Sequence, residues 1–432
     1  MTCPDRFSQW NQEVSRAFPQ LRKSQVSGLA LWSLGIALIG SEGIRQISAL
    51  LAAVLGEKEA TLFQRLREWY LDAQDKVGNH RRDLDVAACF GPLLQWIVGL
   101  HRGDKRLALA LDATTLRDQW IVLSVSVILL GCSIPVAWKV LGSHQKGSWR
   151  PYWEALLAHL QGRVPEDWFV LVMADRGLYA SWLYSSIRAC GWHPFLRINL
   201  GAKVRPVEAQ EFEWISHFVP SVGSSWSGEV DCFVGAKARL HCSLLLHWEA
   251  AYHDPWAIIT DLDHQQARIA WYGLRSWVEG GFKDLKRGAW GWQHSKMVNA
   301  QRVERLWLAM AVALVWTISL GSQAEQDGPR PDATRLPESH IARRKLKRAV
   351  GQAPRRQLSC LVRGRLLLLA QLFLSQPWQI GAFCSEPWPE QCSPPRKRMS
   401  PDQQRVRAHV RERKQRSKQS AKKRIRAAKQ AS

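Results

Sequence analysis

The spacing of hydrophobic residues predicts that the first part of the chain is helical. Residues 1–103 contain apolar positions at helix spacing, in stretches such as GLALWSLGIALIG and EKEATLFQRLREWYLD. Gly40 and Gly56 separate these stretches, and Ser41 is placed to cap the helix between them. We interpret these short helices as a DNA-binding domain. A helical bundle that only supports the next domain is the alternative.

From Asp104 the hydrophobic period changes to that of β-strands. Three strand segments, RLALALDATTL, WIVLSVSVILLG and IPVAWKVL, are followed by a helix, a strand, a helix and a strand. This is the order of a ribonuclease-H-like sheet, in which the first and fourth strands lie side by side and run parallel. The predicted fold class is therefore α/β, with a ribonuclease-H-like mixed sheet between helical N-terminal and C-terminal regions.

A second strand-rich segment interrupts this order. Residues 201–264 contain EFEWISHFV, SGEVDCFVGAKARLHCSLLLHWEA and PWAIITDLD, which predict a β-rich insertion. The insertion divides the core into residues 104–200 and 265–321. The core is expected to resume with a helix near Gln265 or Ala267. The later segment VERLWLAMAVALVWTISLG is apolar on nearly all sides, which favours a helix buried against the sheet.

The composition of the remaining residues predicts three segments. Residues 322–338 read as a linker, residues 339–390 as a helical segment and residues 391–432 as a basic, disordered tail. From Arg396 to Ser432 there are 15 Lys or Arg against two acidic residues, which gives this segment +13 of the total charge. We expect the tail to follow phosphates without reading base sequence. A tail that only keeps the protein soluble is the alternative.

The charge of the whole chain indicates which kind of partner it binds. The formal net charge is +23 at pH 7, and basic residues occur throughout the chain. Both features favour nucleic acid over a membrane surface.

The apolar stretch Trp120–Leu141 contains Gly131, Ser133 and Pro135, which predict two strands joined by a turn and not a membrane span. Nine cysteines without a CxxC pair indicate reduced thiols, so we expect a cytoplasmic, nucleoid-associated protein.

Acidic residues stand at the ends of two apolar strand segments. Asp112 closes LALALD and Asp175 closes FVLVMAD, so both carboxylates are expected at one edge of the sheet. Two anions placed together need a cation. Glu279 supplies a third carboxylate from a helix that can cross this edge. Asp261 and Asp263 compete for the third position, but they precede the helix and are better placed to cap it. Oxygen donors without nearby His or Cys suit two Mg²⁺ or Mn²⁺ ions, which support in-line phosphoryl transfer.

The stretch WYGLRSWVEGGFKDLKRG combines four chemically different side chains at helix spacing. Tyr272, Arg275, Glu279 and Lys286 lie at offsets of 0, 3, 7 and 14, which places all four on one face of a regular helix. The pair Gly280–Gly281 lies among them, although each glycine costs about 1 kcal/mol relative to Ala inside a helix. Close approach of DNA or of a neighbouring strand would account for the glycines, and so would packing.

This spacing resembles the Y-R-E-K signature of DDE transposases of bacterial insertion sequences. LDATTL, ADRG and GFKDLKRGAWGWQ are also similar to family members, and the resemblance covers roughly residues 105–320. It implies a ribonuclease-H-like core with a β-rich insertion before the catalytic Glu. It also implies action as a homodimer on paired DNA ends. The site residues that the resemblance implies are the two-metal ligands Asp112, Asp175 and Glu279 and the phosphate contacts Tyr272, Arg275 and Lys286.

The predicted function is that of a transposase which binds the ends of its own insertion sequence, cleaves them and joins them to target DNA by cut-and-paste. Related enzymes form a DNA hairpin, which requires a flipped base that an aromatic ring can hold by stacking. Some of these relatives carry a Trp directly after the signature Arg. Here that position is Ser276, and Trp277 follows on another helix face. Two alternatives remain open: a structure-specific ribonuclease-H-like nuclease, and a catalytically inactive basic DNA-binding protein.

Overall fold

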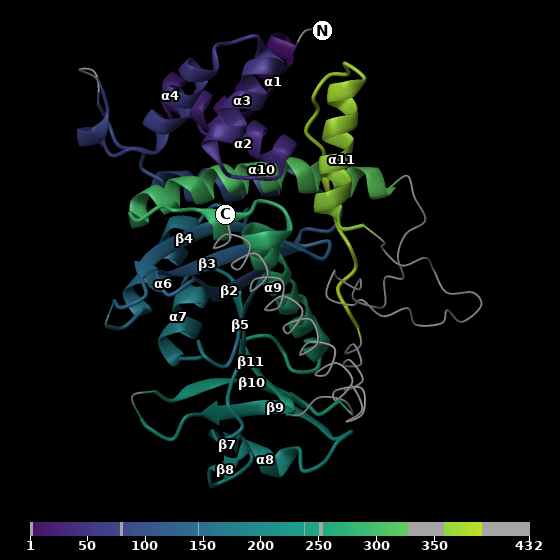
Figure 1. Cartoon of the computed structure of the whole chain (residues 1–432). Coiled ribbons are helices and arrows are strands. Elements are labelled where there is room, and N and C mark those ends of the chain that lie inside the picture. The colour runs from purple at the N-terminus through teal and green to yellow at the C-terminus, as the bar shows by residue number, and fades with distance from the viewer. Residues whose placement is uncertain are drawn as a thin grey trace, which may run out of the picture.

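The chain forms a helical N-terminal unit, a long central helix and a broad mixed sheet, stacked in that order (Figure 1). The computed structural model describes residues 3–77, 81–145, 147–236, 238–249, 254–326 and 358–390. The predicted tail, most of the predicted linker and the start of the predicted C-terminal helical segment lie outside these residues.

Five strands reproduce the core order that the sequence predicts. The strands are β2 (Arg106–Leu116), β3 (Trp120–Leu129), β4 (Cys132–Gly142), β5 (Phe169–Ala174) and β6 (His193–Arg197). Their order in the sheet is β4-β3-β2-β5-β6. The first three are antiparallel neighbours, whereas β2, β5 and β6 run parallel. The prediction that the first and fourth strands lie side by side and parallel is therefore confirmed.

The apolar stretch Trp120–Leu141 is a β-hairpin within this sheet. Leu130 and Gly131 connect β3 to β4 with φ angles of 53° and 73°. Positive φ at both central residues is the requirement of a type I′ turn, whose twist suits the flanking strands. Pro135 lies in β4, an edge strand, next to a shift of register between Val125 and Ser126. An edge position and a local irregularity are where a strand tolerates a residue without an N–H group.

The β-rich insertion extends the same sheet. β11 (Trp256–Thr260) pairs antiparallel with β6, and the order continues through β10, β9, β7 and β8. These strands span Leu240–His247, Ser225–Cys232, Lys203–Pro206 and Glu213–Trp214. The short helix α8 (Ile215–Phe218) follows β8. The insertion therefore lengthens the sheet, which has ten strands in the described part of the chain.

The N-terminal unit consists of helices whose breaks fall at the predicted glycines. The helices are α1 (Cys3–Ala17), α2 (Lys23–Ile39), α3 (Ile44–Leu55), α4 (Glu59–Tyr70) and α5 (Phe90–Leu100). Gly40 and Gly56 end α2 and α3 in the left-handed conformation, which glycine adopts without steric cost. The prediction that Ser41 caps the next helix is wrong, because α3 begins two residues later and Gly43 occupies the cap position. Ser41 Oγ instead accepts a hydrogen bond from the Gly43 N–H.

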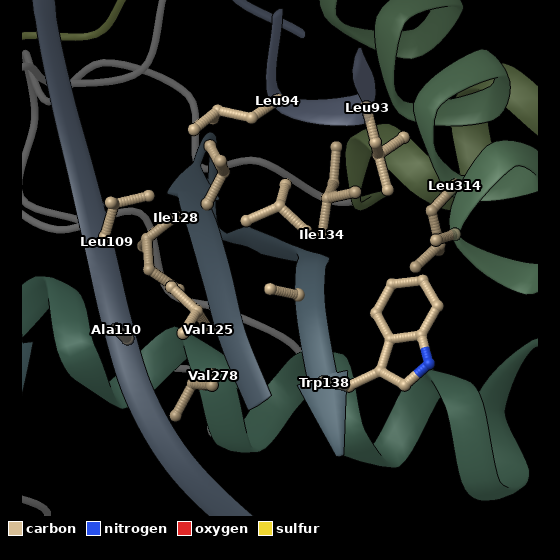
Figure 2. Packing of buried hydrophobic residues seen from close by; sticks show 14 of the residues in the cluster. Leu93, Leu94, Leu109, Ala110, Val125, Ile128, Ile134, Trp138, Val278 and Leu314 are labelled. Atoms are coloured by element: carbon tan, nitrogen blue, oxygen red, sulfur yellow. The ribbon is translucent and has the colours of Figure 1, made fainter. Parts of the chain in front are cut away.

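Helices cover the core strands. α6 (Arg150–Leu160) and α7 (Ser181–Ala189) connect the strands as the sequence predicts. Figure 2 shows side chains from α5, α9 (Ser276–Lys283) and α10 (Ala300–Gln326) packing with side chains of β2, β3 and β4. The labelled side chains are Leu93, Leu94, Leu109, Ala110, Val125, Ile128, Ile134, Trp138, Val278 and Leu314.

Helix α10 is a central helix that packs against α2 on one side and β4 on the other. It is long and apolar enough to cross a membrane by length and composition, but 94% of its apolar window is buried inside the protein. It continues through Gln326, so residues 322–326 are helical and the linker prediction is wrong for them. Local composition suggested a linker there, but Gly321 and Ser322 are enclosed by their neighbours, and tertiary packing overrides local propensity.

Ion pairs fasten the start of α10 to the segment after α4. Arg305 Nη1 lies 2.7 Å from Asp72 Oδ1, and Arg302 Nη2 lies 3.0 Å from Asp72 Oδ2. Burial acts to raise the pKa of Asp72, but the hydrogen bonds and positive charges of Arg305 and Arg302 outweigh it and lower this pKa. Asp72 is therefore held in its ionised form between two arginines, which links the N-terminal unit to the core.

The C-terminal helix α11 (Cys360–Phe373) packs on the far end of α10 through glycines. A Cβ atom built on Gly364 would lie 1.6 Å from the Thr317 carbonyl oxygen, and one on Gly321 would lie 1.8 Å from the Cys360 carbonyl oxygen. Beyond α11, β12 (Phe383–Cys384) pairs in parallel with β1 (His101–Arg102). The C-terminal segment thus returns to the start of the core.

Substitution of Gly364 by Ala tests this close packing. We expect Gly364→Ala to lower the free energy of unfolding by more than about 2 kcal/mol, because the new methyl group overlaps the backbone of α10. Gly99→Ala is the matched control, since Gly99 lies in helix α5 and a Cβ there meets no atom within 4 Å. The control should be neutral or up to about 1 kcal/mol more stable. Chemical denaturation of both variants measures the difference, and equal stabilities would contradict the packing.

A buried carboxyl group between α2 and α3 makes stability depend on pH. Burial raises the pKa of Glu42 to about 7, and its backbone is bonded to Trp290 and Trp32. Because the folded-state pKa lies above the unfolded value of 4.5, the folded protein keeps a proton that the unfolded chain releases. Stability from this group therefore decreases as the pH rises through this window, by roughly 3 kcal/mol at most.

Glu42→Gln should remove this contribution. We expect the free energy of unfolding of the variant to exceed that of the wild type at pH 8, with a smaller difference at pH 5. Glu208→Gln, a change at an exposed position on the insertion, is the control. Denaturant titrations at both pH values measure the effect. A Glu42→Gln difference that does not vary with pH would show that Glu42 does not titrate in this window.

Candidate active site

Two carboxylates emerge side by side where the pairing of β2 and β5 ends. The strands are parallel, and their last paired residues are Leu111 and Ala174. The next residues are Asp112 and Asp175. Asp175 directly follows its strand as predicted. The prediction that Asp112 ends its strand is wrong, because β2 continues to Leu116 and pairs there with β3 alone. What ends at Asp112 is the contact with β5.

Backbone groups orient both aspartates. Asp112 Oδ1 accepts a hydrogen bond from the Ala113 N–H at 2.8 Å, and Asp175 Oδ1 accepts one from the Gly177 N–H at 2.7 Å. A Cβ on residue 177 would lie 3.1 Å from Asp175 Oδ1, so a side chain there would crowd this carboxylate. In each carboxylate the Oδ2 atom remains for a further interaction.

Arg275 provides that interaction for both aspartates. Its Nη2 atom lies 2.9 Å from Asp112 Oδ2 and 3.3 Å from Asp175 Oδ2, and the side chain is only 11% exposed. Burial raises the pKa of Asp112, the positive charge of Arg275 opposes this, and the negative charges of Asp175 and Glu279 add to it. One cation thus pairs with two carboxylates and compensates one of their two negative charges. Glu279 is close enough for its charge to act on Asp112.

The segment that carries Arg275 and Glu279 is not one regular helix. It begins as a 3₁₀-helix (η3, Ile269–Arg275), continues as α9 and ends as a π-helix (η4, Asp284–Gly288). The three helix types advance by different angles per residue, so the stripe predicted from regular spacing is not kept. Tyr272 is 5% exposed, whereas Glu279 is exposed. The prediction of a single common face is therefore wrong.

Tyr272 and Lys286 lie at the two ends of this segment. The ring of Tyr272 packs edge-on against Trp256, with ring centres 5.2 Å apart. Burial raises the pKa of Tyr272 to about 12, although the positive charges of Arg275 and Arg197 oppose the shift. Lys286 is half-buried in η4, and burial together with the charge of Arg287 lowers its pKa. Contact of these side chains with DNA stays a prediction.

Packing accounts for one of the two glycines in this segment. A Cβ built on Gly281 would lie 2.6 Å from Ser133 Oγ and 3.2 Å from the Ser133 carbonyl oxygen. Ser133 belongs to β4, so the glycine lets α9 approach this strand closely. Val278 of α9 points into the same core (Figure 2). The sequence left several explanations for the glycines open. For Gly281, close approach of the helix to an adjacent strand is the explanation that the structure supports.

Three tryptophans of the core and of the insertion have different surroundings. Trp277 is buried and therefore belongs to the core. Trp256 is buried against Tyr272. Trp214 on β8 is 44% exposed, with the Lys203 ammonium 4.7 Å from its ring centre. Among these three side chains, Trp214 has the ring surface that solvent reaches.

The competing acids lie elsewhere. Asp261 Oδ1 lies 3.1 Å from His193 Nδ1, and Asp261 Oδ2 lies 3.4 Å from Arg188 Nε. His193 begins β6, so Asp261 is at the opposite end of that strand from Arg197. Asp263 Oδ1 accepts a hydrogen bond from the Gln265 N–H within a turn. The helical segment begins at Ile269 with Arg268 at the cap position, so the predictions that it starts near Gln265 or Ala267 and that these acids cap it are wrong.

The donor atoms fit a hard divalent cation. Asp112 and Asp175 each direct one oxygen at the same guanidinium nitrogen, and the charge of Glu279 reaches Asp112. Carboxylate oxygens are the ligands that Mg²⁺ and Mn²⁺ prefer. Within the described ranges, no three His, Cys, Asp or Glu side chains are grouped closely enough to hold a metal ion as they stand. Arg275 supplies the positive charge between the aspartates.

Sequence reasoning missed the ion pairs of Arg275 and the neighbourhood of Arg197. Arg197 ends β6 in the same way that Ala174 ends β5, and its charge acts on Tyr272. The rule that placed the aspartates at the ends of parallel strands could therefore have identified Arg197. No local pattern indicates that Arg275 pairs with residues 163 and 100 positions earlier in the chain.

A double substitution tests how α9 is held on the sheet. We expect Gly281→Ala to destabilise the protein by about 1–3 kcal/mol, because the added methyl group meets the side chain of Ser133. The same change in a Ser133→Gly background should cost at least about 1 kcal/mol less. Thermal or chemical unfolding of the wild type and the three variants gives the coupling. Additive effects would mean that these residues do not meet.

Comparison with known proteins adds an independent finding. Residues 105–316 match the model of a family described as the transposase DDE domain. The matched range contains Asp112, Asp175, Arg275 and Glu279. No curated protein matches the chain significantly.

Proposed function

Residues 105–316 form a transposase DDE domain, and from this premise we propose that the protein binds the ends of its own insertion sequence, cleaves them and joins them to target DNA by cut-and-paste. The observation that carries the proposal is the meeting of Asp112 and Asp175 at one cationic group, with the charge of Glu279 acting on the same site. Phosphoryl transfer needs positioning and charge stabilisation and little covalent chemistry from the protein, which suits a site made of carboxylates and cations.

Asp112, Asp175 and Glu279 would hold two Mg²⁺ or Mn²⁺ ions, which activate a water or a DNA 3′-hydroxyl and stabilise the leaving oxygen. The protein contributes orientation. The Ala113 and Gly177 N–H groups fix one oxygen of each aspartate, so the other oxygen points in a defined direction before any ligand arrives. Such preorganisation removes the cost of arranging the donors during the reaction.

DNA contact is assigned to the cationic side chains beside the carboxylates. Arg275 and Lys286 flank Glu279 in sequence, and we propose that both bind phosphates at the cleaved end. Tyr272 belongs to the same proposed set, and its enclosed ring means that the neighbouring side chains must move before its hydroxyl can reach a phosphate. The formal charge of +23, which comes from basic residues throughout the chain, favours association with DNA.

The remaining parts of the proposal come from the resemblance, for the oligomer, and from the composition and helix pattern, for the location and the N-terminal unit. The protein acts as a homodimer on paired ends, one active site for each end, in the cytoplasm at the nucleoid. The helical N-terminal unit is proposed to bind DNA.

Cleavage of the gene's own flanking DNA tests the function. A labelled duplex is incubated with Mg²⁺ or Mn²⁺ and either the wild type, Glu279→Gln or Glu166→Gln. We expect metal-dependent nicking at one position near the element's end by the wild type. Glu279→Gln should reduce it by about 100-fold or more, because a direct metal ligand is lost. Glu166→Gln, an equivalent change at an exposed position before β5, should behave as the wild type.

Binding of the duplex is measured in parallel by gel shift. Binding that persists in Glu279→Gln while nicking is lost separates catalysis from recognition. Binding without nicking by any of the three proteins would leave a basic DNA-binding protein and remove the catalytic assignment. Nicking that depends on DNA shape and not on the element's end would indicate a structure-specific nuclease.

A further inference from the structure

We propose that Arg275 is an internal counter-ion that competes with the divalent metal for Asp112 and Asp175, so that metal binding releases its guanidinium to a DNA phosphate. This inference rests on the proposed function, since the metal is the one that the three acids would bind. It assigns Arg275 two alternating partners, the aspartates and the DNA backbone.

The distances make the two cations mutually exclusive. Arg275 Nη2 lies within hydrogen-bond range of the Oδ2 atoms of both aspartates. A Mg²⁺ ion binds carboxylate oxygens at about 2.0–2.1 Å. A metal held by these carboxylates would use the same Oδ2 atoms that Arg275 now contacts. Two positive groups held at the same carboxylate oxygens also repel each other.

Burial explains why a counter-ion is present at all. The Arg275 side chain is 11% exposed, and burial already works against the ionised form of Asp112. Asp112 is 19% exposed and Asp175 is 44% exposed, so Asp112 in particular is unfavourable as an anion beside Asp175 without a cation. A guanidinium stays charged at every physiological pH, so Arg275 leaves the aspartates by moving and not by losing its proton.

The binding of Arg275 to the aspartates is incomplete, which favours its release. The buried Nε–H of Arg275 has no hydrogen-bond partner within the part of the chain that the structure describes. Both ion pairs are made by the single Nη2 atom. A phosphate group can instead accept two parallel hydrogen bonds from a guanidinium, which is the geometry that this side chain satisfies best. The exchange therefore replaces a one-atom contact by a two-atom contact.

Thermodynamic linkage then couples the two ligands. If metal binding frees Arg275 for phosphate, metal must raise the affinity for DNA, and DNA must raise the affinity for metal by the same factor. Lys286 provides a contrast, because none of the ion pairs described for this site involves it. Its contribution to DNA binding should be the same with and without metal.

The experiment compares Mn²⁺ binding by the full-length wild type, Arg275→Gln and Lys286→Gln in the absence of DNA. Calorimetry should give a dissociation constant for Arg275→Gln that is about 5- to 100-fold lower than that of the wild type, because the competitor is gone. Lys286→Gln removes the same charge nearby without touching the aspartates, so its affinity should stay within about twofold of the wild type. Arg275→Lys, which keeps the charge, should resemble the wild type.

Thermal unfolding supplies a readout independent of activity. In EDTA, Arg275→Gln should unfold at a lower temperature than the wild type, because two carboxylates lose their counter-ion. Addition of Mn²⁺ should raise its unfolding temperature by more than that of the wild type. Ca²⁺ should strengthen binding of the end duplex by the wild type and have a smaller effect on Arg275→Gln.

The outcomes distinguish this inference from the proposed function. Equal or weaker Mn²⁺ binding by a folded Arg275→Gln, with nicking by the wild type intact, would overturn the competition and leave the transposase assignment standing. Tighter binding by Lys286→Gln as well would reduce the effect of Arg275 to general charge and also overturn it. Absence of Mn²⁺ binding in every variant would remove both proposals. If Arg275→Gln does not fold, Arg275→Met provides the neutral variant for the same comparison.

Discussion

The parallel pairing of β2 with β5 is the interaction on which the site depends. Six residue pairs hold the two strands in register, and the pairing stops at Leu111 and Ala174. One residue later the side chains on both strands are acidic. A shift of one residue in this register would separate the carboxylates and turn buried side chains to the opposite face. The chemistry of the site is therefore a consequence of how the apolar strands align.

Helix α10 connects the sheet to the rest of the molecule. The N-terminal helices, β4 and α11 all contact it, and charged groups at its start and glycines at its end fix those contacts. Trp10 of α1 stacks on Trp316 of α10 with ring centres 3.8 Å apart. Segments that are distant in sequence therefore share one apolar helix.

The sequence predicted the parts of the fold that local pattern determines. Alternation of apolar and polar residues and apolar runs located the strands. The order of strands and helices along the chain predicted which strands are neighbours in the sheet. Prediction failed where neighbours decide the outcome. Ser41 was replaced as a cap because α3 starts later. Asp112 lies within β2 because β3 continues to pair beyond it.

The same limit applies to the site. The pair Asp112 and Asp175 followed from sheet topology, which the sequence contains. The change from 3₁₀-helix to α-helix to π-helix between Ile269 and Gly288 is not indicated by the residue spacing, which fits one regular helix. The partners of Arg275 are set by tertiary folding, and spacing along the chain gives no information about them.

The position of α11 has a consequence for the order in which the protein folds during synthesis. The surface of α10 around Thr317 and Gly321 is covered by residues that follow it by about forty positions in the chain. Until the ribosome has released those residues, this apolar surface is open to water and to other chains. Nascent chains with such a surface are exposed to aggregation. Premature termination between α10 and α11 would therefore make an apolar helix permanently accessible, and a chaperone or a protease would recognise the product.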